Sequence, residues 1–331
     1  FDKACDRLAR FGVARGSLEF VPLELDGPDE AIAEAVAGCA LVIHTAGPFQ
    51  GRTNPALLRA ALGSGVPYCD VCDEWPLAQT AKALHDDAAA AGVPTVISCG
   101  IWPGASALMA AEAVDRLGGE CDSLDFSFFT AGTGNAGPTI VSATFLLLCQ
   151  AALTYEAGEE VPKEPWTEQR TIDFGRAVGS KPTWLLDNPD VPTCAAALSV
   201  GSVSSRFGTA PLFWNYLFGA MKSVPPSVLG NREAMQAFAL FSEPIIRFVD
   251  RLVGATNAMR VDARRGSEQV TLRVAHPDLE QCVGLATAAF GLELLGGEIP
   301  GGVWYPAELD AQVRKRILAV VKEDSFVWDM D

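Results

Sequence analysis

The sequence predicts an α/β protein with two domains, and three observations support this prediction. The chain has 331 residues, a length that suits two domains of ordinary size. Its first 117 residues alternate helical and strand patterns with short connections, which is typical of an open parallel sheet. Residues 123–130 then begin a region of different texture, with a strand pattern that has one more exposed face. We expect domains at residues 1–117 and 118–300, and a C-terminal segment, residues 301–331, that returns to the first domain.

Each element of the first region follows from its residue pattern. Residues 2–11 place their apolar side chains on one helical face, and residues 17–25 have the pattern of a strand. Residues 40–45 (ALVIHT) form a continuous apolar run, the pattern of a parallel strand covered on both faces. The same reasoning predicts strands at residues 66–71 and 93–99, and helices at residues 30–38, 54–64, 75–91 and 105–117.

The second region contains fewer clear patterns. Residues 123–130 (SLDFSFFT) form the strand, and a glycine loop leads from it into a helix that we expect to continue through residue 152. Residues 153–211 are irregular, with strand patterns at residues 170–174 and 200–207. Beyond them we expect helices at residues 212–253, 280–295 and 312–321, and a hairpin of residues 257–261 and 269–275.

Composition disfavours several classes of protein. Lys and Arg number 25 against 41 Asp and Glu, a net charge of −16, which disfavours nucleic acids and electrostatic docking on anionic membranes. No apolar run reaches the ~18 residues of an integral membrane segment. The nine cysteines lack framework spacing and indicate reduced thiols in an intracellular compartment.

A glycine motif at residues 132–137 (GTGNAG) allows two interpretations. It matches the G-x-G-x-x-G pattern, follows a predicted strand and opens a helix, as a dinucleotide-binding loop does. Such a loop should be followed within about 20 residues by a strand ending in an acidic residue. Residues 153–161 offer an acidic loop instead. The motif is therefore either a nucleotide-phosphate loop or a tight connection of the second domain that faces the cleft.

Acidic residues cluster after the strand predicted at residues 66–71. Asp70, Asp73 and Glu74 follow it at the edge where open parallel sheets bind ligands. A carboxylate there can bind an amine or transfer a proton, so Asp70 and Asp73 are candidate catalytic residues. The same side chains can instead cap the next helix.

Arg206 stands alone in a stretch that is otherwise poor in charge, residues 200–216. A guanidinium grips a carboxylate with two hydrogen bonds, so Arg206 is a candidate clamp or catalytic residue; a structural salt bridge is the alternative. We expect a substrate pocket between the strand ends and the second domain, lined by Asp70, Asp73, Trp102, Thr130, Gly132, Gly134 and Arg206.

No metal site is predicted. Cys69 and Cys72 have C-x-x-C spacing, but residues three apart on a strand point to opposite faces, and no second pair or nearby histidine completes a zinc site. His44 lies inside a predicted strand and is either an interior histidine or a residue that faces a ligand.

Several segments together resemble the saccharopine dehydrogenase-like (saccharopine reductase-like) family. They are residues 46–49 (AGPF), residues 68–70 (YCD) and residues 100–106 (GIWPGAS); residues 130–138, 206–211 and 302–306 resemble the plant, algal and cyanobacterial version. The resemblance covers nearly the whole chain. It implies a Rossmann-type NAD(P)-binding domain and a second α/β domain that closes the substrate cleft, and it places the 132–137 loop in that second domain.

The resemblance also implies a cofactor groove along the strand ends. We expect its residues to be Thr45, Ala46, Gly47, Pro48, Phe49, Asp70, Cys99 and Gly100. The family's phosphate-binding loop follows a first strand that has no counterpart in this sequence. We therefore expect an amino-terminally truncated chain, with an incomplete Rossmann-type sheet, that binds dinucleotide poorly. NADP is the expected preference, although the discriminating position is missing too.

These points make an NAD(P)-dependent oxidoreductase our leading hypothesis, acting on an amino-acid-like or related small molecule. The alternative is a non-catalytic Rossmann-fold protein that binds a nucleotide, a lipid or a protein. The apolar run at residues 212–221 (LFWNYLFGAM) motivates that alternative, unless the run is simply buried. We also expect a plastid location if the source is a phototrophic eukaryote, the cytoplasm otherwise, and a possible homodimer.

Overall fold

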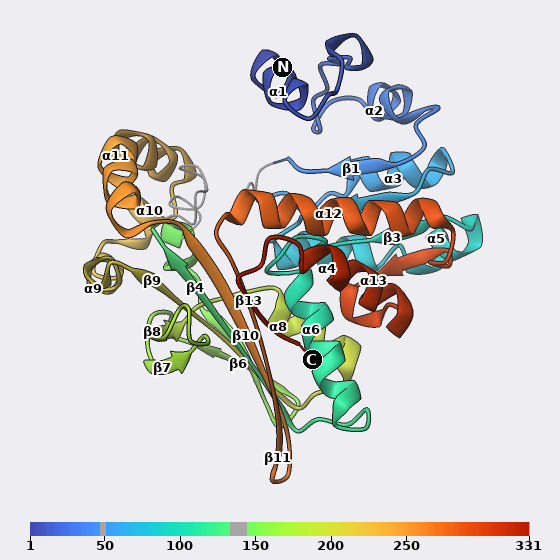
Figure 1. Ribbon diagram of the computed structural model, residues 1–331. Coiled ribbons are helices and arrows are strands. Elements are labelled where there is room, and N and C mark those ends of the chain that lie inside the picture. Colours follow the sequence, from blue (N-terminus) through green and yellow to red (C-terminus); the bar gives the residue numbers. More distant parts are fainter. Residues whose placement is uncertain (47–50, 133–143, 331) are drawn as a thin grey trace.

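The strands form two sheets that lie at an angle to each other (Figure 1). The computed structural model describes residues 1–46, 51–132 and 144–330. In these residues the first sheet is parallel throughout, with neighbouring strands in the order β1-β2-β3-β12. Its strands are β1 (Val42–His44), β2 (Tyr68–Asp70), β3 (Pro94–Val96) and β12 (Gly302–Trp304).

Helices from both ends of the chain accompany the first sheet. The helix α12, which the sequence assigns to the second region, packs against β2 and β3 and also contacts α13. The C-terminal segment contributes β12 to the first sheet and another strand, β13, to the second sheet. These helices are α1 (Asp2–Ala9), α2 (Asp29–Val36), α3 (Ala56–Gly63), α4 (Trp75–Lys82), α5 (His85–Ala91), α12 (Leu279–Gly296) and α13 (Ala311–Val321).

The second sheet is mixed and larger. Its described strands run in the order β13-β11-β10-β4-β9-β5-β6, and β8 joins β9 and carries β7. Among its described pairings, only that of β4 with β9 is parallel. The strands are β4 (Ser123–Ala131), β5 (Ala152–Glu156), β6 (Glu159–Lys163), β7 (Arg170–Asp173), β8 (Ser180–Leu185), β9 (Ser202–Ala210), β10 (Thr256–Arg265), β11 (Glu268–His276) and β13 (Val327–Asp329).

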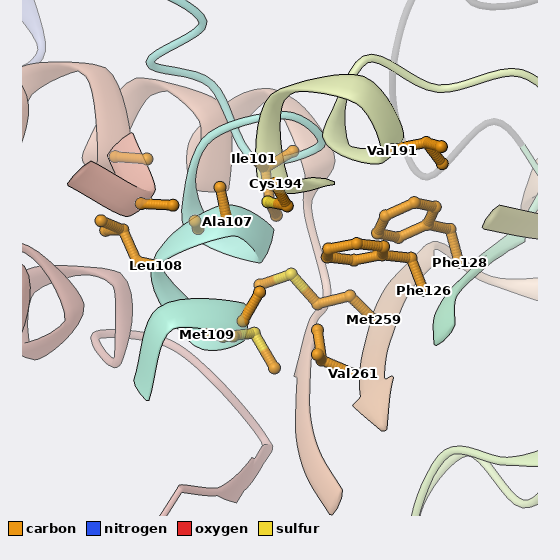
Figure 2. Packing of buried hydrophobic residues seen from close by; sticks show 14 of the residues in the cluster. Ile101, Ala107, Leu108, Met109, Phe126, Phe128, Val191, Cys194, Met259 and Val261 are labelled. Atoms are coloured by element: carbon orange, nitrogen blue, oxygen red, sulfur yellow. The ribbon is translucent and has the colours of Figure 1, made fainter. Parts of the chain in front are cut away.

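The helix α6 (Ala105–Arg116) connects the two sheets and lies in the largest core. Its small and apolar side chains are buried from Ala105 through Ala111, so the helix can approach its neighbours closely. Met109 lies beside Met259 and Val261 of β10, with Phe126 and Phe128 of β4 nearby, whereas Leu108 points to the side away from the two phenyl rings (Figure 2). The helix α8 (Asp190–Leu198) packs against α6 on one side.

The predicted fold class is confirmed: the protein is α/β, with a parallel sheet and a further mixed sheet. The strand predicted at residues 17–25 is wrong. Residues 15–17 form a short 3-10 turn, and residues 18–24 follow it without regular structure, with Phe20 and Val21 exposed. No described strand pairs with this segment, so the apolar alternation alone cannot make it a strand.

Two further expectations need correction. β1 is the edge strand of its sheet and Ile43 is 44% exposed, so its apolar run is not covered on both faces. The helix expected to continue through residue 152 is helical in its described part only at residues 144–147, and β5 begins at Ala152. The strands predicted at residues 170–174 and 200–207 are present as β7 and β9, but residues 153–211 are not otherwise irregular. They also form most of β5, together with β6, β8 and α8; β5 and β8 pair with β9, and β6 pairs with β5.

Among the described residues, no helix combines the length and the apolar composition that crossing a membrane requires.

We predict that Gly104, the residue before α6, cannot be replaced by alanine. Its φ is +133°, and a Cβ there would lie 2.0 Å from the carbonyl oxygen of Gly100. Gly104→Ala should lower the free energy of unfolding by at least about 3 kcal/mol. Gly119 is the control, because its φ of +84° is also left-handed but its Cβ would meet nothing within 4 Å.

Urea unfolding of both variants measures the difference. Gly119→Ala should cost about 1 kcal/mol, the backbone strain alone. Equal losses in the two variants would contradict the steric explanation.

Candidate active site

A cavity of about 330 Å³ lies where the carboxyl ends of the first sheet meet the second half of the chain. One wall follows β1 and β2, and the other precedes β5 and α8. This is the edge at which parallel α/β sheets bind ligands. The lining includes Arg52, Asp73, Glu74 and Trp75 on the first wall, and Gln150, Leu153, Asp187, Asn188 and Pro192 on the second.

Asp70 is the buried centre of the strand ends. Its Oδ1 accepts hydrogen bonds from the backbone nitrogens of Ser98 at 2.7 Å and Cys72 at 3.0 Å. Its Oδ2 accepts from the Tyr68 hydroxyl at 3.2 Å, and that hydroxyl lies 2.8 Å from Nδ1 of His44. Burial raises the pKa of Asp70, although these hydrogen bonds oppose the rise. Asp70 therefore joins the segments after β2 and β3, and holds them at the cavity.

Asp73 is one of three acidic residues that line the cavity, with Glu74 and Asp187. It is half-buried, and burial together with the nearby carboxyls of Asp70, Asp190 and Glu74 raises its pKa to about 8. A group with such a pKa can gain or lose a proton near neutral pH. The helix-cap interpretation gains no support, because the N-cap residue of α4 is Glu74 and its side chain makes no capping hydrogen bond.

Asp190 lies behind the cavity at the start of α8 and is fully buried. Its Oδ2 accepts a hydrogen bond from the Ser106 hydroxyl of α6 at 2.5 Å, whereas its Oδ1 has no protein partner among the described residues. Burial raises the pKa of Asp190 to about 7. The carboxyl groups of Asp70, Asp73 and Asp190 thus lie close to one another beside the cavity. Each has a raised pKa and is harder to ionise than an exposed aspartate.

The segment before α8 is a part of the site that the sequence analysis missed. Asp187 accepts a hydrogen bond from the backbone nitrogen of Leu153 at 3.0 Å, and burial raises its pKa. The side-chain nitrogen of Asn188 lies 3.4 Å from the Trp102 carbonyl oxygen, and its Oδ1 accepts from the Asp190 nitrogen at 2.8 Å. The available signal was the run of residues 187–190 (DNPD), because Asp, Asn and Pro together are typical of a turn.

The structure gives Arg206 the salt bridge rather than the substrate contact. It is 1% exposed, and its guanidinium nitrogens lie 3.4 Å from Asp125 Oδ1 and 3.1 Å from Glu168 Oε2. The next residue, Phe207, contacts Trp102 on the other face of β9. Successive strand residues point to opposite faces, so Arg206 points away from the cavity.

The residues predicted for a cofactor groove separate into three groups. Thr45 and Ala46 follow β1 and are exposed, so a ligand at the sheet edge can reach them. Cys99 and Gly100 are buried after β3, and the Cys99 nitrogen donates to the Asp70 carbonyl oxygen at 2.6 Å. Gly47, Pro48 and Phe49 lie outside the described residues.

The remaining predicted substrate residues lie beside the cavity or farther along the second sheet. Trp102 stacks on Phe128 with ring centroids 5.1 Å apart, and its ring nitrogen is buried without a partner among the described residues. The Thr130 hydroxyl donates to Thr209 at 3.2 Å, and the Gly132 nitrogen donates to the Ala210 carbonyl oxygen at 2.8 Å. Gly134 lies outside the described residues, so the choice between the two interpretations of its motif stays a prediction.

In the part of the chain that the structure describes, no group of three or more His, Cys, Asp or Glu side chains is placed to hold a metal ion. His44 is half-buried and bonded to Tyr68, and Cys69 is buried whereas Cys72 is half-buried.

The fold of this chain is similar to the folds of several solved protein structures. Apo saccharopine dehydrogenase (L-Glu forming) of Saccharomyces cerevisiae is similar, with 13% identity, 92% of this chain and 86% of that chain covered, and a TM-score of 0.59. The homospermidine synthase of Legionella pneumophila in complex with NAD is similar too, with 10% identity and a TM-score of 0.64; the match covers 98% of this chain and 83% of that chain. No family model and no curated protein matches the sequence. These likenesses establish the fold.

We predict that Asp190 makes stability depend on pH. The folded state keeps its proton up to about pH 7, whereas an unfolded aspartate loses it near pH ~4. The unfolded state binds fewer protons between these values, so the folded state loses stability as pH rises through them. Asp190→Asn has no such proton. As pH rises toward 7, the free energy of unfolding of the variant should therefore increase relative to that of the wild type, by up to about 1.4 kcal/mol per pH unit.

Urea unfolding at pH 5, 6, 7 and 8 measures this difference, which should level off above pH 7. Glu34→Gln, at an exposed position of α2, is the control and should show no such trend. A difference between Asp190→Asn and the wild type that stays constant from pH 5 to 7 would contradict the argument.

Proposed function

We propose that the protein is an NAD(P)-dependent oxidoreductase that acts on an amino-acid-like or related small substrate. The observation that supports this best is the position of Asp73, a proton-exchanging carboxyl in a cavity at the ligand-binding edge of a parallel sheet. The fold is shared with a saccharopine dehydrogenase and with a homospermidine synthase that was solved with NAD. A bound nicotinamide would supply hydride transfer to or from a C–N or C–O carbon.

The charge of the cavity supports an amine on the substrate. Asp73, Glu74 and Asp187 line it, whereas Arg52 is the cation on its described walls and pairs with Asp26. A substrate ammonium would favour the ionised form of Asp73 and offset the burial that disfavours it. Arg206 does not line this cavity, so among the described lining residues Arg52 is the guanidinium that a substrate carboxylate could meet.

Asp73 then has a defined role in the reaction. Oxidation of an amine requires that a proton leave its nitrogen, and a carboxylate within reach accepts it. Reduction in the opposite direction requires a proton at the same position, which protonated Asp73 donates. Asp70 acts on Asp73 from behind, because it fixes the segment after β2 through the Cys72 nitrogen.

Cofactor binding tests the proposal first. We expect quenching or enhancement of NADPH fluorescence on titration with the intact protein, with a weaker response from NADH, because NADP is the preferred form in our proposal. The exposed Thr45 and Ala46 should contact the nicotinamide half. If neither NADH nor NADPH binds at millimolar concentration, the oxidoreductase proposal fails.

Asp73→Asn tests the role of the carboxyl. It should keep cofactor binding but lower kcat by about 10²-fold or more in an NAD(P)⁺-reduction assay with a panel of amino acids and diamines. The kcat/KM of the wild type should rise with pH toward about 8, where Asp73 of the free protein ionises, and the variant should lack that limb.

Asp86→Asn, at an exposed position of α5, is the matched control and should leave both the rate and the pH profile unchanged. An Asp73→Asn enzyme with wild-type kcat and an unchanged pH profile would remove Asp73 from the mechanism.

A further inference from the structure

An exposed apolar surface lies on three helices that follow β9: α9 (Leu212–Met221), α10 (Pro226–Leu229) and α11 (Arg232–Val253). We call them the apolar lobe; they stand at one end of the second sheet, away from α12 and α13 (Figure 1). Exposed large apolar side chains gather on the lobe, and soluble proteins rarely leave such a patch without a function. They are Leu212, Phe213, Tyr216, Leu217, Val228, Phe238, Leu240, Phe241, Phe248 and Leu252.

The inner face of α9 is held by specific contacts with β9 and with Trp166. The exposure of its outer face is therefore not the result of a loosely packed helix. Asn215 is 1% exposed, accepts a hydrogen bond from the Thr209 nitrogen at 3.0 Å and donates to the Thr209 carbonyl oxygen at 2.6 Å. The Trp166 ring nitrogen donates to the Asn215 carbonyl oxygen at 2.8 Å, and Phe218 packs edge-on against Trp166. Polar and aromatic contacts thus fix which face of α9 points outward.

The outward face of α9 lacks the groups that a protein partner needs. The helix contains no charged residue, and on its exposed positions Tyr216 supplies the one side-chain polar group. Protein interfaces use about one hydrogen bond per 100–200 Å² and a polar rim to set their register. A lipid surface needs neither, because it presents no fixed pattern of donors and acceptors.

The helix α11 has the pattern of a helix that lies flat in a membrane interface. Phe238, Phe241, Phe248 and Leu252 recur at helical spacing and are 45–79% exposed. Arg247 and Arg251 adjoin the last two, and basic residues beside a Phe- and Leu-rich face are typical of interfacial helices.

The charge of the lobe selects the kind of lipid. Residues 212–253 carry four basic and three acidic residues, whereas the whole chain has a net charge of −16. The lobe is thus nearly neutral, and the rest of the molecule is repelled by an anionic surface. We propose that the apolar lobe docks the protein reversibly on a zwitterionic lipid surface, with Phe213, Tyr216, Phe241 and Phe248 at the headgroup–acyl boundary. This docking does not depend on the reaction proposed above.

Flotation with phosphatidylcholine vesicles tests the docking. The wild type should float with the vesicles, and the double variant Phe213→Ser/Phe241→Ser should lose at least tenfold of its partition coefficient. The matched control is Leu292→Ser/Leu295→Ser, which removes exposed apolar side chains from α12 and should float like the wild type. The partition should persist in 0.5 M NaCl, because apolar insertion is not screened by salt.

Thermal unfolding checks that the double variant is folded, and Tyr216→Lys alone serves as a second test if it is not. A wild type that stays in the aqueous fraction overturns the proposal, as does a control that loses flotation as much as the lobe variant. Sedimentation equilibrium tests whether a second copy of the chain covers the surface instead. If the wild type is a dimer, the lobe variant is a monomer and the wild type does not float, the lipid proposal is wrong and the surface is a dimer interface.

Discussion

The packing of α6 against the second sheet is the constraint on which the site depends. The helix starts at Gly104, where only glycine fits beside the Gly100 carbonyl, and its small residues allow it to lie close to β10 and α8. From this position Ser106 reaches Asp190 across the junction. The two walls of the cavity are therefore placed by one helix, and a change in its packing would move the carboxyl groups relative to each other.

Buried aspartate side chains have opposite pKa shifts at the junction beside the cavity and on the face of the second sheet that carries Asp125. Burial raises the pKa of Asp73, Asp190 and Asp187, because few cations face them at the junction. Burial opposes ionisation of Asp125 as well, but the Ser204 hydroxyl and the guanidinium groups of Arg170, Arg206 and Arg264 prevail and lower its pKa. The buried Arg206 thus pairs with a structural carboxylate, and the junction stays acidic. This difference distinguishes a scaffold carboxylate from one that can exchange protons.

The sequence predicted the parts of the fold that local pattern determines. The apolar runs that became β2 and β3 and the acidic residues after β2 were found, because buried parallel strands and their ends leave a clear local signal. The strand expected at residues 17–25 failed because a strand needs a partner. The strands β5, β6 and β8 were missed because pairing with other strands forms them: β5 and β8 pair with β9, and β6 pairs with β5. Arg206 was misassigned because its orientation depends on strand register, and Asp190 was missed because its importance comes from Ser106, 84 residues away.

The apolar lobe and the cavity are connected by a short series of rigid contacts. Asn215 of α9 is bonded to Thr209 on β9, and Phe207 of the same strand touches Trp102, whose carbonyl oxygen faces Asn188 of the cavity wall. Each step is a hydrogen bond, a ring contact or the strand β9 itself, so α9 cannot turn freely relative to the cavity. A lipid surface that binds the lobe would consequently fix the orientation of the cavity as well, and the opening near Asp73 would keep a constant relation to that surface.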